Sequence, residues 1–207
     1  MPIVASASKK TYIEDKKRSY RSVESFLSCV FTDIQYSNDE LILEANLLND
    51  IERYYRGYYP LSQDITVWTQ FMTFDKEYSH LSNVVCNKIV IEDSSTLAGK
   101  IPAIYTSRTG SRTIVSWKRS SSPLLKTSKH EKYALPPLSR YYDTNFWRYA
   151  VELNIYAYIL AAQNQPVNSI WLIQFDPEGK EYLKYEIPMM LERVKTLIAM
   201  ASDKSFV

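Results

Sequence analysis

The sequence predicts an α/β protein with a mixed β-sheet flanked by helices. Two observations lead to this fold class. Stretches with helical periodicity stand on both sides of a block of short β-branched stretches, and 45% of the 207 residues are hydrophobic, which suffices for a buried core. The expected order is three helices, a three-stranded meander, one helix, two strands and a closing helix.

Three helices are expected before the sheet. Residues 22–33 carry apolar side chains at the three- and four-residue spacing of an amphipathic helix. Asn38 can cap a second helix and Gly57 can end it, whereas Ser62 can cap a third. The apolar stripe of the second helix is expected to consist of Leu41, Ala45 and Leu48.

The chain is expected to form one domain over residues 21–207, behind a basic and flexible segment over residues 1–20. That segment contains five Lys and Arg but no apolar stretch of the kind found in secretory signals. No apolar stretch approaches the roughly 20 residues of a membrane-spanning helix. We therefore expect an intracellular protein without a membrane partner.

A meander is expected in the middle of the chain. Residues 88–93, 96–105 and 113–119 are short stretches rich in β-branched residues, and turn residues separate them. A polar stretch rich in Ser, Lys and Pro follows over residues 119–142, and we call it the basic loop.

Four elements are expected after the basic loop. Residues 144–163 have apolar side chains at helical spacing, and residues 169–175 form an apolar stretch typical of a buried strand. The turn sequence DPEG separates that strand from another over residues 182–187. Residues 189–200 are expected to form the closing helix.

The net charge of +2 hides a concentration of positive charge around the basic loop. Between Arg108 and Arg140 there are eight Lys or Arg and one acid, Glu131. Such a stripe indicates either an anionic partner or an ordinary solvated loop, and both interpretations stay open. If the partner is nucleic acid, its backbone is expected to contact Arg112, Lys118, Arg119, Lys126, Lys129, Lys132 and Arg140.

The composition disfavours several chemistries. The chain has only 4 Gly, and neither of the phosphate-binding motifs GxxxxGK[ST] and GxGxxG is present. Cys29 and Cys86 cannot make a disulfide framework, and together with His80 and His130 they have no spacing suited to zinc. Any bound metal would therefore depend mainly on carboxylates.

Three stretches in a fixed order carry a resemblance to a known family. They are 97–105 (LAGKIPAIY), 112–120 (RTIVSWKRS) and 146–160 (FWRYAVELNIYAYIL). In this order they resemble the PD-(D/E)XK nuclease superfamily, in its RecB-type exonuclease branch and especially the forms found in large DNA viruses. With the flanking stretches, the resemblance covers about residues 19–198.

The resemblance implies a PD-(D/E)XK nuclease-like core and a metal-dependent nuclease site. In that family one acid follows a glycine on the second strand of the meander, a D/E-x-K motif lies on the third, and a Q-x-x-x-Y motif lies on the next helix. Mg²⁺ prefers hard oxygen ligands such as these carboxylates. The metal activates water and the lysine helps to orient it.

The sequence departs from this pattern where the metal would bind. Pro102 stands at the strand acid, Ser116 and Lys118 at D/E-x-K, and Glu152 and Tyr156 at Q-x-x-x-Y. Proline offers no ligand atom, and serine is a poor neutral ligand for Mg²⁺. We therefore expect a degenerate nuclease with no catalytic residue, no metal ligand and no cofactor. Lys118 is either a remnant that binds phosphate or the ion-pair partner of Glu152.

An active nuclease would need relocated acids, with Mg²⁺ or Mn²⁺ as cofactor. Glu92 and Asp93 lie one strand earlier, Asp75 and Glu77 lie in the third helix, and Glu152 is on the helix that faces the site in the family. Only Glu152 is well placed, and acids at a strand end more often belong to a turn.

Three functions are thus compatible with the sequence. The first is an inactive nuclease fold that binds nucleic-acid backbone, DNA rather than RNA, through the basic loop. The second is a protein-interaction or scaffold subunit of a larger, viral assembly, because the aromatic clusters at 54–59 and 141–147 can form a protein interface as well as stack on bases. The third is the active nuclease. A viral protein of this kind is expected in the host cytoplasm, the nucleus or the virion.

Overall fold

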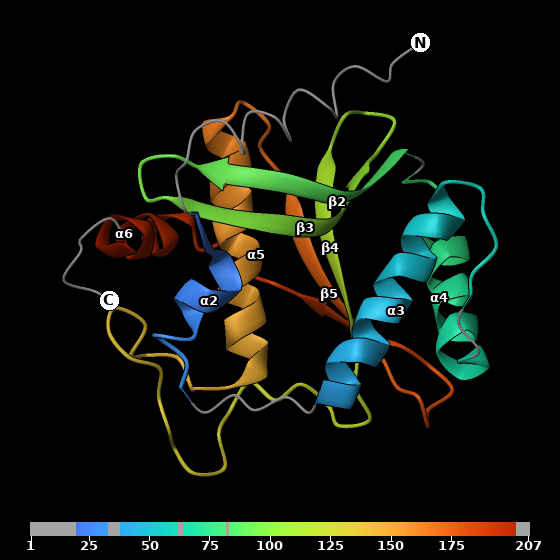
Figure 1. Cartoon of the computed structure of the whole chain (residues 1–207), viewed down its shortest axis with the longest axis horizontal. Coiled ribbons are helices and arrows are strands. Elements are labelled where there is room, and N and C mark those ends of the chain that lie inside the picture. Colours follow the sequence, from blue (N-terminus) through green and yellow to red (C-terminus); the bar gives the residue numbers. More distant parts are fainter. Residues whose placement is uncertain (1–19, 33–37, 62–63, 82, 202–207) are drawn as a thin grey trace.

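A mixed sheet lies in the middle of the protein (Figure 1). The computed structural model describes residues 20–32, 38–61, 64–81 and 83–201, so the basic segment expected at 1–20 lies outside them except for its last residue. Within these residues the sheet has six strands in the order β1-β3-β4-β5-β6, and β2 also pairs with β3. The strands are β1 (Arg21–Ser22), β2 (Asn83–Glu92), β3 (Leu97–Thr106), β4 (Arg112–Arg119), β5 (Ser169–Phe175) and β6 (Leu183–Glu186).

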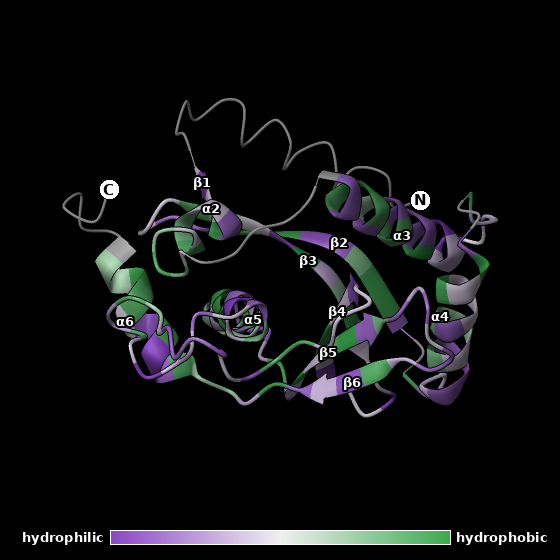
Figure 2. Cartoon of the chain, turned by 90° about the horizontal axis from the view of Figure 1, so that it is seen from below, coloured by the Kyte–Doolittle hydropathy of each residue, from purple (hydrophilic) through white to green (hydrophobic). Residues whose placement is uncertain are grey.

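Helices cover both faces of the sheet (Figure 1). One face carries α2 (Val23–Leu27), α5 (Asn145–Ala162) and α6 (Leu191–Ala201), and the other carries α3 (Asn38–Tyr55) and α4 (Ile65–Glu77). Figure 2 shows α5 enclosed between the sheet and the pair formed by α2 and α6. The predicted fold class, a mixed sheet flanked by helices with a helical N-terminal part, is therefore confirmed.

Each face of the sheet has its own hydrophobic core. Ile114 and Leu172 pack into the core on the α5 side, whereas Val115 and Ile173 pack into the core on the side of α3 and α4. Successive side chains of a strand point to opposite faces, so β4 and β5 supply both cores. The sheet therefore needs apolar residues at consecutive positions, as the sequence has there.

The paired strands β2 and β3 exchange faces halfway along their length. Asn87 has a φ of 53°, and it lies opposite Pro102, which has no N–H for the ladder. On one side of this point Cys86 packs toward the α3–α4 core, and on the other side Val90 belongs to the α5 core. The ribbon thus contributes to both cores in turn.

The first helix is shorter than its periodicity predicts. A helix was expected over 22–33, but α2 ends at Leu27, with Ser22 as its N-cap. Beyond it the chain tightens, and the Val30 N–H donates to the carbonyl three residues back at 3.0 Å. Val30 and Phe31 are nevertheless buried. The apolar spacing therefore predicts burial correctly and conformation wrongly.

The second helix buries a different stripe from the one predicted. Leu41 and Ala45 are exposed and Leu48 is half-buried, whereas Leu47 and Ile51 are buried. Because the C-terminal half of α3 packs on α4 and on the sheet, that half sets the rotation of the whole helix. Apolar side chains in its first turns consequently stay on the surface.

The short strand β1, which pairs in parallel with β3, was not predicted, and the other elements agree with the sequence in type and order. Gly57 follows α3 with a φ of 83°, as expected for a residue that ends a helix. Asp64 caps α4 by accepting a hydrogen bond from the Val67 N–H at 3.2 Å, whereas the predicted cap, Ser62, lies outside the described residues. No helix in the described stretches is both long and apolar enough to span a bilayer.

Candidate functional site

β3 and β4 separate at the positions that the resemblance assigns to metal ligands. Their antiparallel ladder ends at the Ala103–Val115 pair. Pro102 and Ser116 come directly after that pair, where β4 continues beside β5. Pro102 is half-buried and Ser116 is buried. The two positions are therefore neighbours at a split in the sheet, and neither carries a carboxylate.

Lys118 lies two residues farther along β4, on the same face as Ser116. Its Nζ lies 2.7 Å from Oε1 of Glu44 on α3, and 4.1 Å from the centroid of the Tyr149 ring. The side chains of Lys118 and Glu44 are 15% and 18% exposed, so water screens this ion pair only in part. The sequence left two roles open for Lys118, a phosphate-binding remnant or the ion-pair partner of Glu152, and it gave no indication of Glu44.

The hydroxyl of Tyr156 lies between two glutamates. It is 2.9 Å from Oε1 of Glu152, one turn earlier on α5, and 3.1 Å from Oε1 of Glu24 on α2. The Tyr156 ring is fully buried and packs directly on Gly99 of β3, where any added Cβ would overlap the ring. Gly99 therefore provides the space that Tyr156 occupies.

The protonation of this cluster follows from its burial. Burial raises the pKa of Glu152, Lys118 lowers it, Glu24 raises it, and Tyr156 and Arg148 lower it. Burial, together with the two glutamates, also raises the pKa of Tyr156, which stays a neutral phenol. Both shifts favour the protonated forms of Glu152 and Tyr156.

These residues do not fit the Mg²⁺ or Mn²⁺ site that the fold family implies. Pro102 has no donor atom, and Ser116 offers only a neutral hydroxyl. In the part of the chain that the structure describes, no group of three or more His, Cys, Asp or Glu is arranged to hold a metal ion. Glu24 and Glu152 approach one another at the Tyr156 hydroxyl, and two carboxylates fall short of such a group.

The other acids considered for relocation make contacts elsewhere. Asp75 accepts hydrogen bonds from the hydroxyls of Tyr54 and Tyr55, at 2.9 and 2.6 Å. Glu92 and Asp93 end β2 and lead into the turn before β3. The further partners are Tyr182 for Glu77, Ser94 for Glu92 and Tyr20 for Asp93.

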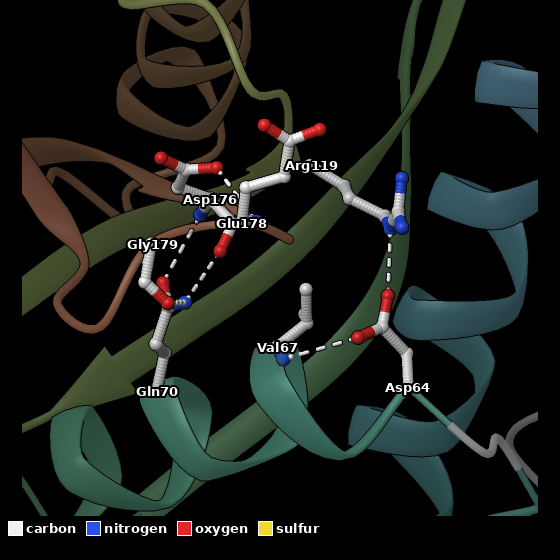
Figure 3. A network of polar contacts seen from close by, with 7 residues as sticks. All are labelled: Asp64, Val67, Gln70, Arg119, Asp176, Glu178 and Gly179. Carbon is white, nitrogen blue, oxygen red and sulfur yellow. Dashed lines mark hydrogen bonds and ion pairs between the residues drawn. The ribbon is translucent and has the colours of Figure 1, made fainter.

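The predicted backbone-binding residues on β4 do not lie together. Arg112 begins the strand and Arg119 ends it, so an extended chain separates them by about 23 Å. Arg119 points toward α4, where its Nε donates to Oδ2 of Asp64 at 2.9 Å (Figure 3). Asp64 is also the N-cap of that helix. Arg112 and Arg119 are thus set apart from the Lys118 site.

The other predicted residues lie on the basic loop, which runs along the lower edge of the molecule past the start of α5 in Figure 1. Lys126, Lys129 and Arg140 are exposed, and Lys132 is half-buried. The Lys126 ammonium lies 5.0 Å from the centroid of the Phe146 ring on α5. The structure therefore brings positive charge to the surface beside the N-terminal end of α5.

A buried amide holds the start of this loop. The side-chain nitrogen of Gln174, on β5, donates to the carbonyls of Ser120 and Ser122 at 2.9 and 2.8 Å. Its oxygen accepts the Leu124 N–H at 3.1 Å. Sequence reasoning missed this role, although a single glutamine in the apolar stretch SIWLIQF could have indicated it.

Two further buried amides also position loops. Gln70 on α4 donates to the carbonyls of Asp176 and Gly179 at 2.6 and 3.2 Å and accepts the Asp176 N–H at 3.0 Å (Figure 3). Asn154 on α5 accepts the Met190 N–H at 2.6 Å, just before α6. Neither residue was singled out from the sequence, and each again interrupts an apolar helix face.

Comparison with known proteins supports the fold. No protein-family model and no curated protein matches the sequence. Among solved structures, a "Putative exonuclease" from Eubacterium rectale matches with a TM-score of 0.55 at 10% identity, over 96% of this chain and 83% of that one. A weaker likeness is to SSO0001, with a TM-score of 0.43 at 14% identity over 96% and 81% of the two chains. The first match shows a nuclease-like fold.

Proposed function

We propose that this chain is an inactive protein of the RecB-type PD-(D/E)XK branch, as found in large DNA viruses, and that it binds nucleic-acid backbone through the basic loop. The observation that carries the proposal is a juxtaposition. The basic loop follows directly from β4, the strand that carries Ser116 and Lys118, and it displays exposed cations past the start of α5. A nuclease-like fold can thus keep its anionic ligand after losing its chemistry.

The absence of ligands at the split sheet supports binding without cleavage. A nuclease of this kind needs a metal ion to activate water, and one or two carboxylates usually hold such an ion. The carboxylates of Glu24 and Glu152 both contact the Tyr156 hydroxyl. Lys118 is engaged by Glu44. Cleavage in Mn²⁺ that disappears in Glu152→Gln would replace our proposal with an active nuclease.

The well-packed conformation of the basic loop supports binding to a nucleic-acid backbone. Leu124, Ala134 and Leu138 are buried in the α5 core, and Gln174 holds the first residues of the loop. The cations are therefore displayed on a fixed framework. Phosphate contacts by Lys and Arg provide affinity that depends on salt and little on base sequence.

The test is fluorescence anisotropy with labelled DNA at two salt concentrations. Replacing Lys126, Lys129 and Arg140 by Ala should weaken binding at least 10-fold and should lower the slope of log K against log salt by roughly 2 to 3, since each phosphate contact contributes about 0.9. A matched control replaces the exposed Lys100, Lys180 and Lys195 by Ala, which removes the same charge. Equal affinity of the two triple variants would contradict the proposal.

A second candidate function, a subunit of a larger assembly, is favoured by the surface of α3 and α4. Tyr59 is 89% exposed and Ile65 is 79% exposed, beside a cavity of about 410 Å³ at Tyr58 and Trp68. Exposed apolar patches often mark protein interfaces. We call the exposed apolar side chains of α3, α4 and the segment between them the apolar surface; they are Leu41, Ile42, Leu43, Tyr58, Tyr59, Leu61, Ile65 and Met72.

The partner chemistry proposed for the apolar surface is a second copy of the chain. A two-fold interface joins the same patch of both copies, so a charged side chain near the axis would meet its own copy. Residues 65–74 contain no charged side chain, so this part of the surface avoids such repulsion. Sedimentation should therefore show association that Ile65→Lys abolishes, while the exposed control Val85→Lys on β2 leaves it intact. A wild-type chain that stays monomeric at every concentration would remove this candidate.

A further inference from the structure

Tyr133 and Tyr142 stack on each other at the outside of the basic loop. Their ring centroids are 4.7 Å apart and the ring planes meet at 21°. The two residues form an isolated antiparallel bridge, so their side chains leave the same side of a short two-stranded ribbon. We call this pair the tyrosine stack.

Main-chain hydrogen bonds hold the ribbon on both sides of the bridge. The Ala134 N–H donates to the Tyr141 carbonyl, and the Asp143 N–H donates to the Lys132 carbonyl, each at 2.9 Å. Ala134, Tyr141 and Asp143 are buried. Since neighbouring residues of an extended chain alternate in direction, the tyrosine stack faces away from the core.

One ring of the stack remains open to a ligand. Tyr133 is 45% exposed, and Tyr142 covers only one of its faces. A hydrogen bond with Tyr142 raises the pKa of Tyr133, as does the charge of Glu131 to a smaller degree, so that the ring stays a neutral phenol at neutral pH. A fixed, neutral aromatic face of this kind suits the flat face of a nucleobase.

Two cations lie close to the stack in the sequence. Lys132 immediately precedes Tyr133, and Arg140 lies two residues before Tyr142. We infer that the tyrosine stack receives one base of a single-stranded nucleic acid whose phosphates follow these cations. The inference rests on the proposed backbone binding by the basic loop, and it names the class of nucleic acid.

A paired duplex cannot use the stack in this way. Its bases lie between their neighbours, whereas those of a single strand can turn outward onto an aromatic side chain. The phosphates of both forms can reach the cations equally well. The stack should therefore set the preference for single strands, and the cations should set the overall affinity.

A charge change at Glu131 can be compared with the loss of the Tyr133 ring. The Glu131 carboxylate lies in the same loop and repels phosphate. Glu131→Gln should strengthen binding of single and double strands alike, by about 2-fold, since it changes only the charge. Tyr133→Ala should act on single strands alone.

The experiment measures anisotropy of labelled single-stranded and duplex DNA of one sequence with the full chain. Tyr133→Ala should weaken single-strand binding about 10-fold, as expected for one lost base–aromatic stack, and should change duplex binding less than about 2-fold. Tyr133→Phe keeps the ring and should bind like the wild type. Leu183→Ala removes an exposed apolar side chain on β6, away from the basic loop, and should have no effect. Strands containing 2-aminopurine should lose fluorescence on binding to Tyr133→Phe but much less on binding to Tyr133→Ala.

The outcomes separate the two proposals. If the triple variant of Lys126, Lys129 and Arg140 binds weakly but Tyr133→Ala matches the wild type on both ligands, the stacking inference fails and the proposed function stands. If Tyr133→Ala weakens both ligands equally, the stack has no role in strand preference and the inference is again overturned. If the wild type binds neither ligand, the proposed function itself fails.

Discussion

The Lys118 ammonium and the Glu44 carboxylate, 2.7 Å apart, join the end of β4 to α3. Lys118 is the residue that the resemblance assigns to the lysine of D/E-x-K, and this ion pair engages its ammonium group. The pair is only partly screened by water, and its loss should lower the free energy of unfolding by about 1 kcal/mol.

Glu44→Gln should therefore lower the stability of the protein and raise its affinity for nucleic acid. The amide no longer neutralises Lys118, so affinity should rise a few-fold and the salt slope should rise by about 0.9. Urea unfolding and anisotropy measure the two effects. The exposed Glu181→Gln changes the net charge equally and serves as the control. An unchanged salt slope in Glu44→Gln would show that Lys118 stays away from phosphate.

Gly99→Ala should destabilise the protein because the added methyl group overlaps the Tyr156 ring, whose hydroxyl oxygen would lie at 2.9 Å. The expected cost is about 1 to 3 kcal/mol in urea unfolding, as for other overpacked core positions. Tyr156→Phe should not relieve it, because the nearest ring carbon remains. In a Tyr156→Ala background the same change should cost almost nothing, and an additive double-mutant cycle would contradict this account.

Glu152 should make stability depend on pH. Its pKa is raised by burial in the folded protein, so the native state holds this proton more tightly than the unfolded chain. The resulting contribution is present below about pH 4.3 and is lost as the pH rises through the folded pKa. Glu152→Gln should thus gain stability relative to the wild type between acidic and neutral pH. Urea unfolding at both ends of that range measures the gain, and parallel pH profiles would refute it.

Carboxylates at the split between β3 and β4 should restore metal binding. Pro102→Asp combined with Ser116→Asp places two acids next to the last pair of the ladder, near Glu152. Titration calorimetry with Mn²⁺ should show binding in this double variant, because Mn²⁺ favours carboxylate ligands. Pro102→Asn with Ser116→Asn has similar shapes without the charges and should not bind. If neither double variant binds Mn²⁺, the assignment of these two positions to metal ligands is wrong.

Local patterns were sufficient for much of the fold. The meander, α5 and β5 were expected from stretches whose periodicity is strong within a few residues. The end of α2 at Leu27 and the buried stripe of α3 were not, because contacts with distant elements decide them. Leu41 and Leu47 both fit a helical stripe, and only packing on α4 selects the second.

The candidate site was predicted only in part for the same reason. The resemblance places Lys118, Glu152 and Tyr156 together, and the structure has them in one cluster. Glu24 and Glu44 were missed because they come from separate helices and their partners are far along the chain; Glu44 is 74 residues from Lys118. No spacing in the sequence indicates such contacts.

The anchoring of the basic loop has a calorimetric consequence. Leu124, Ala134 and Leu138 are already packed in the core of the free protein, so a ligand does not need to fold this loop. A disordered basic segment that folds around its target buries new apolar area and shows a large negative change in heat capacity. Here the binding enthalpy should stay nearly constant with temperature, and association should be as fast as charge attraction allows. A nucleic acid would therefore bind a loop that is already folded in the free protein.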